Sequence, residues 1–227
     1  MNGVHRHLFI NLPVRLRDPN CPKKINVLFK VDTGAGIDRL WMENSKTKGA
    51  VTVRMGTEAD YVGVVASTVG DDLTDHLNVD LGAGRDEFYL KGYTAPAEIK
   101  GNLLINMASV ETEVDVDTVT IDLAKVGGTL FARTGAGDDS VNMKRVIVGN
   151  DFTLSTGADR DTAILSEIQV LDDFWADMGS GNDTLDVDDI SADVFQALGG
   201  DGNDTLIRRR NGQVRVNVFP SGFETMR

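Results

Sequence analysis

The chain has 227 residues, 41% of them hydrophobic, and its 35 acidic and 23 Lys or Arg residues give a formal net charge of −12. This length suffices for one domain with a hydrophobic core, and the negative charge disfavours binding to the phosphate backbone of a nucleic acid. Cys21 is the only cysteine, which excludes an internal disulfide. The sequence contains no run of 18 apolar residues, the length that a membrane-spanning helix needs.

Residues 1–24 begin with His5, Arg6 and His7 and continue into a short apolar patch from Leu8 to Leu12. Because no cleavage site of small residues follows this patch, the segment is a poor secretory signal. We expect it to form a lead-in and cap that covers the first unit of the fold.

Residues 25–207 contain a repeat. The pattern Gly-x-Gly-x-Asp-x-apolar, or a close variant, occurs in eight copies, whose first residues are Gly34, Gly56, Gly82, Glu113, Gly135, Gly157, Gly179 and Gly200. Successive starts differ by 22, 26, 31, 22, 22, 22 and 21 residues. A fixed period of this length predicts a solenoid, and the roughly 4 and 9 extra residues in the second and third intervals predict loop insertions.

Apolar residues flank every copy with a spacing of two. Five and three places before the starts they are Phe29, Val51, Leu77, Ala108, Leu130, Phe152, Phe174 and Phe195, and Val31, Val53, Val79, Val110, Ala132, Leu154, Ala176 and Ala197. Six and eight places after the starts they are Leu40, Val62, Phe88, Val119, Val141, Ala163, Leu185 and Leu206, and Met42, Val64, Leu90, Ile121, Met143, Leu165 and Val187, with Arg208 as the exception. This spacing predicts strands that bury one face.

Each unit therefore predicts a strand, a tight Gly-rich turn, a second strand and a third short segment such as Val146 to Val148. Such units bury their apolar faces only by stacking. We predict an all-β fold, a right-handed parallel β-helix of about eight coils. Residues 208–227 predict a last strand with Val214, Val216 and Val218, followed by the other cap.

The repeat places one aspartate in every turn: Asp38, Asp60, Asp86, Asp117, Asp139, Asp161, Asp183 and Asp204. In stacked coils these carboxylates would lie about 4.8 Å apart and repel one another by about 1 kcal/mol per pair in water, and by more near a protein surface. A divalent cation would relieve this repulsion. Calcium is favoured because it takes six to eight oxygen ligands in irregular geometry, whereas magnesium requires a strict octahedron, and the three scattered histidines offer no zinc site.

Glycines allow a turn to bend sharply and to aim its carbonyl oxygens toward one point. The candidate metal-binding residues are therefore the turn glycines and the acidic residues beside them: Gly34, Gly36, Asp38, Asp60, Gly82, Gly84, Asp86, Asp117, Gly135, Gly137, Asp139, Gly157, Asp159, Asp161, Gly179, Gly181, Asp183, Gly200, Gly202 and Asp204.

The last turn, from Gly199 to Leu206, resembles the nonapeptide of the repeats-in-toxin, or hemolysin-type, calcium-binding proteins. The resemblance implies calcium between neighbouring turns, held by turn carbonyls and by Asp38, Asp86, Asp139, Asp183 and Asp204, and it implies an extracellular or cell-surface protein. The chain departs from the family pattern because it has one such turn per 22 residues, and because Glu58, Asp115 and Asp159 replace the second glycine in three turns.

Two other functions stay open. A polysaccharide lyase or hydrolase would need acids such as Asp172, Asp173, Asp186, Asp188 and Asp189, with Trp175 as a sugar-stacking surface, but no nucleophile with its base occurs and we do not expect an enzyme.

A binding module for carbohydrate or a cell-surface partner would use Trp41 and Tyr89. Both lie seven residues after the start of a turn, and both are predicted to face outward. Two such rings on one face of the solenoid could form a single aromatic surface.

Overall fold

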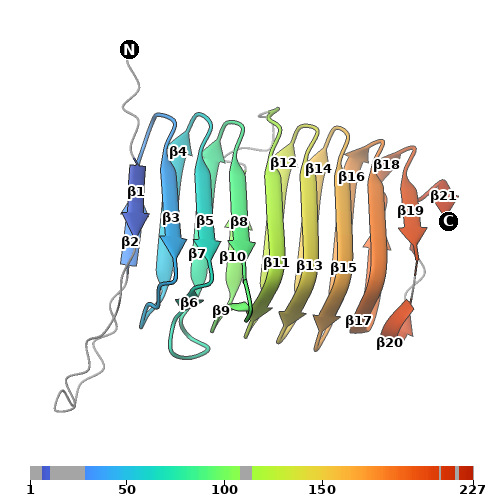
Figure 1. Cartoon of the computed structure of the whole chain (residues 1–227). Coiled ribbons are helices and arrows are strands. Elements are labelled where there is room, and N and C mark those ends of the chain that lie inside the picture. The colour runs from blue at the N-terminus through green and yellow to red at the C-terminus, as the bar shows by residue number, and fades with distance from the viewer. Residues whose placement is uncertain (1–6, 11–28, 108–113, 210, 218–219, 227) are drawn as a thin grey trace.

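The computed structural model describes residues 7–10, 29–107, 114–209, 211–217 and 220–226. This part of the chain contains strands and no helix, so none of it could cross a membrane as a helix. All pairings between the strands are parallel. The predicted all-β solenoid of stacked coils is confirmed, and Figure 1 shows its two long sheets, one behind the other.

The sheet at the front of Figure 1 contains β1 (His7–Ile10), β3 (Arg39–Glu43), β5 (Tyr61–Val65), β8 (Glu87–Lys91), β11 (Thr118–Val126), β13 (Ser140–Val148), β15 (Thr162–Val170), the start of β17 (Thr184–Leu198), β19 (Thr205–Arg208) and β21 (Thr225–Met226). The rear sheet contains β2 (Phe29–Asp32), β4 (Val51–Thr57), β7 (Leu77–Ala83), β10 (Leu103–Asn106), β12 (Leu130–Ala136), β14 (Phe152–Ala158), β16 (Phe174–Gly181), the end of β17 and β18 (Asp201–Gly202). Along the lower edge, β6 (Thr68–Val69) and β9 (Ala97–Ile99) continue into the ends of β11, β13 and β15, and β20 (Asn211–Asn217) pairs with β17.

The chain ascends the rear sheet, crosses a Gly-rich turn at the top of Figure 1 and descends the front sheet, while it advances from the N- to the C-terminal end. This winding is right-handed, as parallel crossovers are in nearly all proteins. At the lower corner, six of the coils each have one non-glycine residue with a positive φ between 46° and 61°. These residues are Asn44, Ala66, Leu123, Arg145, Glu167 and Asp189. No sequence signal marked this second corner.

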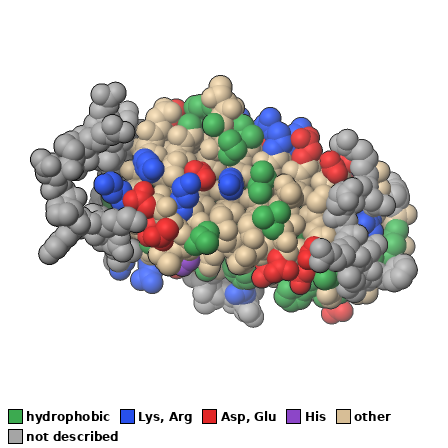
Figure 2. All heavy atoms as spheres, turned by 90° about the horizontal axis from the view of Figure 1, so that it is seen from below, with side chains coloured by type: hydrophobic (Ala, Val, Ile, Leu, Met, Phe, Trp, Pro, Cys, Tyr) green, Lys and Arg blue, Asp and Glu red, His purple; other side chains and the backbone are tan. Residues whose placement is uncertain are grey.

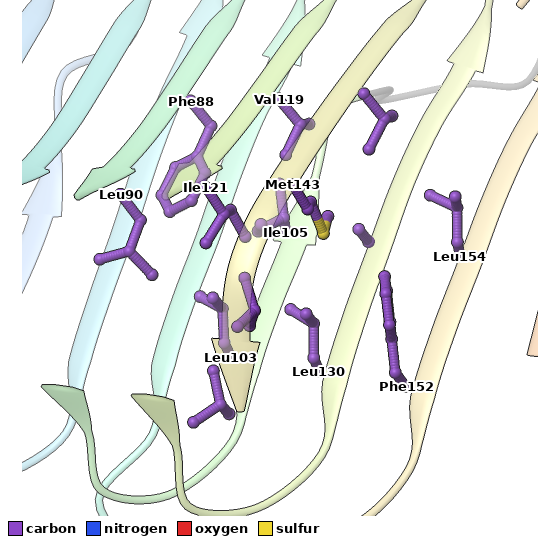
Figure 3. Packing of buried hydrophobic residues seen from close by; sticks show 14 of the residues in the cluster. Phe88, Leu90, Leu103, Ile105, Val119, Ile121, Leu130, Met143, Phe152 and Leu154 are labelled. Atoms are coloured by element: carbon purple, nitrogen blue, oxygen red, sulfur yellow. The ribbon is translucent and has the colours of Figure 1, made fainter. Parts of the chain in front are cut away.

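The inner faces of the front and rear sheets form one hydrophobic core. The residues six places after each turn start are buried, from Leu40 to Leu206, and so are those eight places after it, from Met42 to Val187. Both columns face the buried residues of the rear strands. Figure 3 shows this packing, with Phe88 and Met143 on the front strands opposite Leu103 and Phe152 on the rear strands. Burying a side chain of this kind contributes about 1.5–3 kcal/mol, so the apolar columns hold the coils together.

In the fourth coil, the residues that we predicted for the rear strand are wrong. We placed Ala108 and Val110 in the rear columns, but Leu103 and Ile105 occupy those positions, in register with Leu130 and Ala132. Ala108, Val110 and the turn start Glu113 lie outside the described residues. By register, the nine extra residues of this interval divide into four at the corner before Ala97 and five between Met107 and Val114. The spacing rule failed because it assumed a single insertion.

Both predicted caps contribute strands. In the lead-in 1–24, β1 pairs with β3, and Cys21 lies outside the described residues. In the segment 208–227, β20 adds to β17 as the predicted last strand, with Val214 and Val216 in it and Val218 outside the described residues. After β20 the chain forms a further turn, and β21 pairs with β19.

Candidate metal site at the aspartate ladder

The Gly-rich turns stack backbone on backbone. Gly135 and Gly157 are paired in register with φ values of 119° and 114°. A Cβ on Gly157 would lie 1.7 Å from the carbonyl oxygen of Gly135, so only glycine leaves room for this approach. Hydrogen bonds also link neighbouring turns, as from the Gly137 N–H to the Ala158 carbonyl at 2.9 Å. The turns therefore form one continuous edge with carbonyl oxygens directed along the stack.

The eight repeat aspartates form a ladder of hydrogen bonds, which we call the aspartate ladder. In the seven rungs after Asp38, one carboxylate oxygen, Oδ1, accepts the backbone N–H of the aspartate one coil earlier, as Asp161 does from Asp139 at 2.9 Å. The same bond measures 2.7–2.9 Å along the rest of the ladder, accepted by Asp60, Asp86, Asp117, Asp139, Asp183 and Asp204. The alignment that the sequence predicted for these acids is thus present, and seven of the eight carboxylates satisfy a buried donor.

The second carboxylate oxygen of most rungs is buried and has no hydrogen-bond partner. Such Oδ2 atoms belong to Asp60, Asp86, Asp139, Asp161, Asp183 and Asp204. The residues themselves are at most 3% exposed, so bulk water does not reach these atoms. A buried, unpartnered carboxylate oxygen is expensive as long as it carries charge. The ladder therefore requires a proton or a cation at these positions.

Burial raises the pKa of six ladder carboxyls. It raises the pKa of Asp60 to about 7 and those of Asp86 and Asp161 to about 8, while the hydrogen bond from the preceding rung lowers each pKa in part. The pKa values of Asp139 and Asp183 rise to about 6, and that of Asp204 is raised, also through burial. The charges of neighbouring acids act in the same direction. Without a cation, several rungs bind a proton near neutral pH.

The ladder ends on a residue that sequence analysis missed. Oε2 of Glu224 accepts the Asp204 N–H at 2.6 Å and so replaces the next aspartate. Glu224 follows Gly222, which has a φ of 75°, and Thr225 is in register with Thr205. Residues 220–226 are therefore a ninth, degenerate turn, in which Gly222 lies against Gly199 and Gly200 and Glu224 replaces the aspartate. The spacing of 20 residues was the available signal.

The acids that replace the second glycine lie on the outside of the turns. Glu58 and Asp159 are exposed and adopt positive φ values of 80° and 77°. Oδ2 of Asp115 accepts the Gly84 N–H at 2.9 Å, one coil earlier. These side chains surround the turns, whereas the ladder oxygens are buried within them.

The donor set fits a hard cation in its chemistry, because the unpartnered oxygens and the turn carbonyls are the ligands that calcium prefers. In the described residues, the ladder does not bring three carboxylates together. Three ligand oxygens within 4.8 Å of one another occur instead at Asp151, Asp172 and Asp173, an exposed or half-buried group beside the lower loops. An ion at the ladder would therefore take carboxylate oxygens from one or two rungs and the remaining ligands from backbone carbonyls.

The acids considered for glycoside chemistry do not form one cluster. Asp172 and Asp173 lie with Asp151, whereas Asp186 on β17 is paired with Arg209 at 2.5 and 2.9 Å. Asp188 and Asp189 follow further along β17. Trp175 is exposed on β16, in the rear sheet. In contrast, Trp41 and Tyr89 meet as predicted, with nearly parallel rings 6.4 Å apart.

Comparison with protein-family models gives no match, and comparisons with curated proteins and with solved structures give none either. The resemblance to the hemolysin-type repeats therefore rests on the turn residues alone. What the structure shows is a parallel solenoid of about 22 residues per coil with a ladder of buried aspartates.

Proposed function

We propose that this protein is a structural β-solenoid whose Gly- and Asp-rich turns bind calcium, and that calcium stabilises the stacking of its coils. The observation that carries the proposal is the row of buried Oδ2 atoms without hydrogen-bond partners, which recurs from coil to coil. A repeated defect of this kind would oppose folding unless it served a ligand that the coils share.

The charge of the ladder gives the energetic reason. Neighbouring rungs are one strand spacing apart, about 4.8 Å, and a pair of charges at such a distance interacts by about 3–4 kcal/mol at the effective dielectric of a protein surface. The chain already carries a net charge of −12. Calcium would supply positive charge and oxygen coordination at once.

The residues that would hold the ion belong to the edge formed by the turns. Six of the ladder aspartates offer one oxygen that has no hydrogen-bond partner, and the turn glycines offer carbonyl oxygens. The exposed carboxylates of Glu58 and Asp159 would increase the local negative potential that attracts cations. The chain uses glycine at these positions because a side chain would collide with the neighbouring turn.

Protons and calcium would compete for the same oxygens, because the pKa values of Asp86 and Asp161 reach about 8. Calcium modules of the extracellular kind bind with dissociation constants of about 10⁻⁴–10⁻³ M. Sites of this affinity fill at millimolar calcium, which supports an extracellular or cell-surface location as part of the proposal.

Thermal unfolding at pH 8.5 tests the proposal, because protons replace calcium least at this pH. We expect a midpoint that rises when 5 mM calcium replaces a chelator, by an amount that follows ligand linkage: about 1–2 kcal/mol for each site at 10 times its dissociation constant. Magnesium at the same concentration serves as a control and should give a smaller increase, because its octahedral demand suits the turns less well.

The matched variants are Asp161→Asn in the ladder and Asp32→Asn on the exposed part of β2. The ladder variant should reduce the calcium response, while the variant on β2 should keep it. A midpoint that is equal in calcium and in chelator would rule out calcium as the stabilising ion.

A further inference from the structure

The outer face of the front sheet carries three aromatic rings in adjacent coils. We call Trp41 on β3, Tyr61 on β5 and Tyr89 on β8 the aromatic patch. The ring of Trp41 lies 5.8 Å from that of Tyr61 and 6.4 Å from that of Tyr89, with interplanar angles of 14° and 15°. Three rings from different coils thus share one orientation, and they lie on the sheet face rather than at the Gly-rich turns.

Gly63 makes this arrangement possible. Its position is in register with Trp41 on one side and with Tyr89 on the other. A Cβ at residue 63 would lie 2.4 Å from Cε3 of Trp41 and 3.0 Å from Cε1 of Tyr61, so both rings lie over this glycine. Gly63 is buried although it belongs to the outward-facing set of the strand, because the rings cover it. The absent side chain lets the rings form a continuous apolar surface close to the backbone.

Hydrogen bonds fix the patch at its lower edge. Oε2 of Glu43 accepts the indole Nε1–H of Trp41, and Oε1 of Glu43 accepts the hydroxyl of Tyr93, each at 3.2 Å. Tyr93 is 56% exposed and extends the aromatic area over the corner of the coil. A surface whose rings are held in place before binding loses little conformational entropy when a ligand arrives.

The charges around the aromatic patch cancel. Arg39 and Glu87 flank Tyr61 in register on the neighbouring strands. Glu43 lies at the other edge, and the charge of Lys91 acts on Tyr93. Two positive and two negative side chains thus border the rings, in a protein whose net charge is −12. Polyanions such as nucleic acids are repelled by the whole molecule, and the local balance favours an uncharged ligand with many hydroxyl groups.

We propose that the aromatic patch binds neutral saccharides. A hexopyranose presents C–H groups on its faces and hydroxyls on its rim, and the electron-rich ring faces suit the C–H groups. The carboxylates and the guanidinium at the border suit the hydroxyls, which need directional partners. Ligand sites of this class combine aromatic contact area with a few placed polar groups. A stable protein partner would instead require an interface of more than about 1,000 Å². This area is larger than the surface that three rings present.

Fluorescence of Trp41 provides the assay. The chain has two tryptophans, so the variant Trp175→Phe leaves Trp41 as the single reporter. We expect saturable changes in its emission on titration with cellohexaose or maltohexaose, with a dissociation constant of about 1 mM, as is typical of a small, exposed contact area. The titration is repeated in calcium and in chelator, because the patch shares no residue with the aspartate ladder and its binding does not depend on the calcium proposal.

Three variants separate binding from stability. Gly63→Ala places a methyl group beneath the rings, and Tyr89→Ala removes one of them, so each should weaken binding by at least about tenfold. Trp175→Ala, monitored by saccharide NMR signals, removes an exposed ring on the opposite sheet and should leave binding unchanged. The proposal is overturned if neither hexasaccharide gives a saturable signal, or if folded Gly63→Ala and Tyr89→Ala bind as tightly as the parent.

Discussion

Replacement of Asp161 by alanine or by asparagine tests whether the ladder works through its hydrogen bonds or through its charge. Alanine removes the Oδ1 atom that accepts the Asp139 N–H at 2.9 Å and leaves a buried donor without a partner. Such a loss costs about 1–3 kcal/mol. Asparagine keeps an acceptor of the same shape and removes the titrating group. At pH 6 in chelator, a pKa of about 8 keeps Asp161 protonated in the folded protein, whereas its ordinary pKa of 3.8 leaves it ionised after unfolding. The asparagine variant needs no proton on folding and should therefore already be more stable than the parent by up to about 3 kcal/mol.

The parent and the asparagine variant diverge with pH. Because the pKa of Asp161 is raised from 3.8 to about 8 on folding, its contribution to stability is complete below pH 3.8 and is lost as the pH rises toward 8. The loss is about 1.4 kcal/mol per pH unit, so the parent should lose up to about 3 kcal/mol relative to Asp161→Asn between pH 6 and pH 8. Urea unfolding at both pH values measures these differences. Equal stability of the alanine and asparagine variants at pH 6 would refute the hydrogen-bonded ladder.

Three further changes follow from the packing of the coils. Gly157→Ala should destabilise the fold by about 3 kcal/mol or more, since its Cβ would lie 1.7 Å from the Gly135 carbonyl oxygen. The control Gly34→Ala, whose Cβ would have nothing within 4 Å, should cost only about 1 kcal/mol for its φ of 85°. Equal melting points of the two variants would contradict this expectation. Phe174→Ala should cost about 3–5 kcal/mol in denaturant unfolding, because the ring is fully buried between Phe152 and Phe195 at 5.2 and 5.0 Å, and a cost below 1 kcal/mol would indicate a loosely packed core. Glu224→Ala should accelerate amide hydrogen exchange at Asp204, whose N–H it leaves unbonded, while Glu224→Gln should not; identical exchange in both variants would mean that Glu224 does not end the ladder.

The sequence predicted the coil because the apolar residues and the aspartates all repeat with the same period. Leu40, Val62 and Phe88 are spaced like the aspartates beside them, so the strands, their burial and the alignment of Asp38, Asp60 and Asp86 follow from one register. The same logic predicted the contact between Trp41 and Tyr89. Periodicity is informative wherever identical residues must stack.

Features that depend on local deviations from the period were missed. In the fourth coil two insertions of different length shift the rear strand relative to the turn, and Leu103 replaces the residue expected from spacing. Tyr61 joins the aromatic patch from a neighbouring column because Gly63 has no side chain, so the rings of Tyr61 and Trp41 pack beside each other over this residue. Glu224 was overlooked because its longer side chain reaches the position of an aspartate. In each case side-chain reach or loop length, rather than spacing, decides the contact.

The sequence also left the environment of the aspartates undetermined. Alignment alone predicted mutual repulsion. It did not predict that in six of the carboxylates one oxygen would accept a backbone N–H while the other would be buried without a partner. Burial raises the pKa values of these carboxyls, and a cation bound as we propose would replace the proton at the same atom.

Carboxyl ¹³C NMR of the ladder aspartates, titrated with and without calcium, tests this account most directly. In chelator we expect the carboxyls of Asp86 and Asp161 to titrate near pH 8. In millimolar calcium their midpoints should move to lower pH, because the ion displaces the protons from the same oxygens. Titration curves that are the same in calcium and in chelator would contradict the account and would leave protons as the ligands of the ladder.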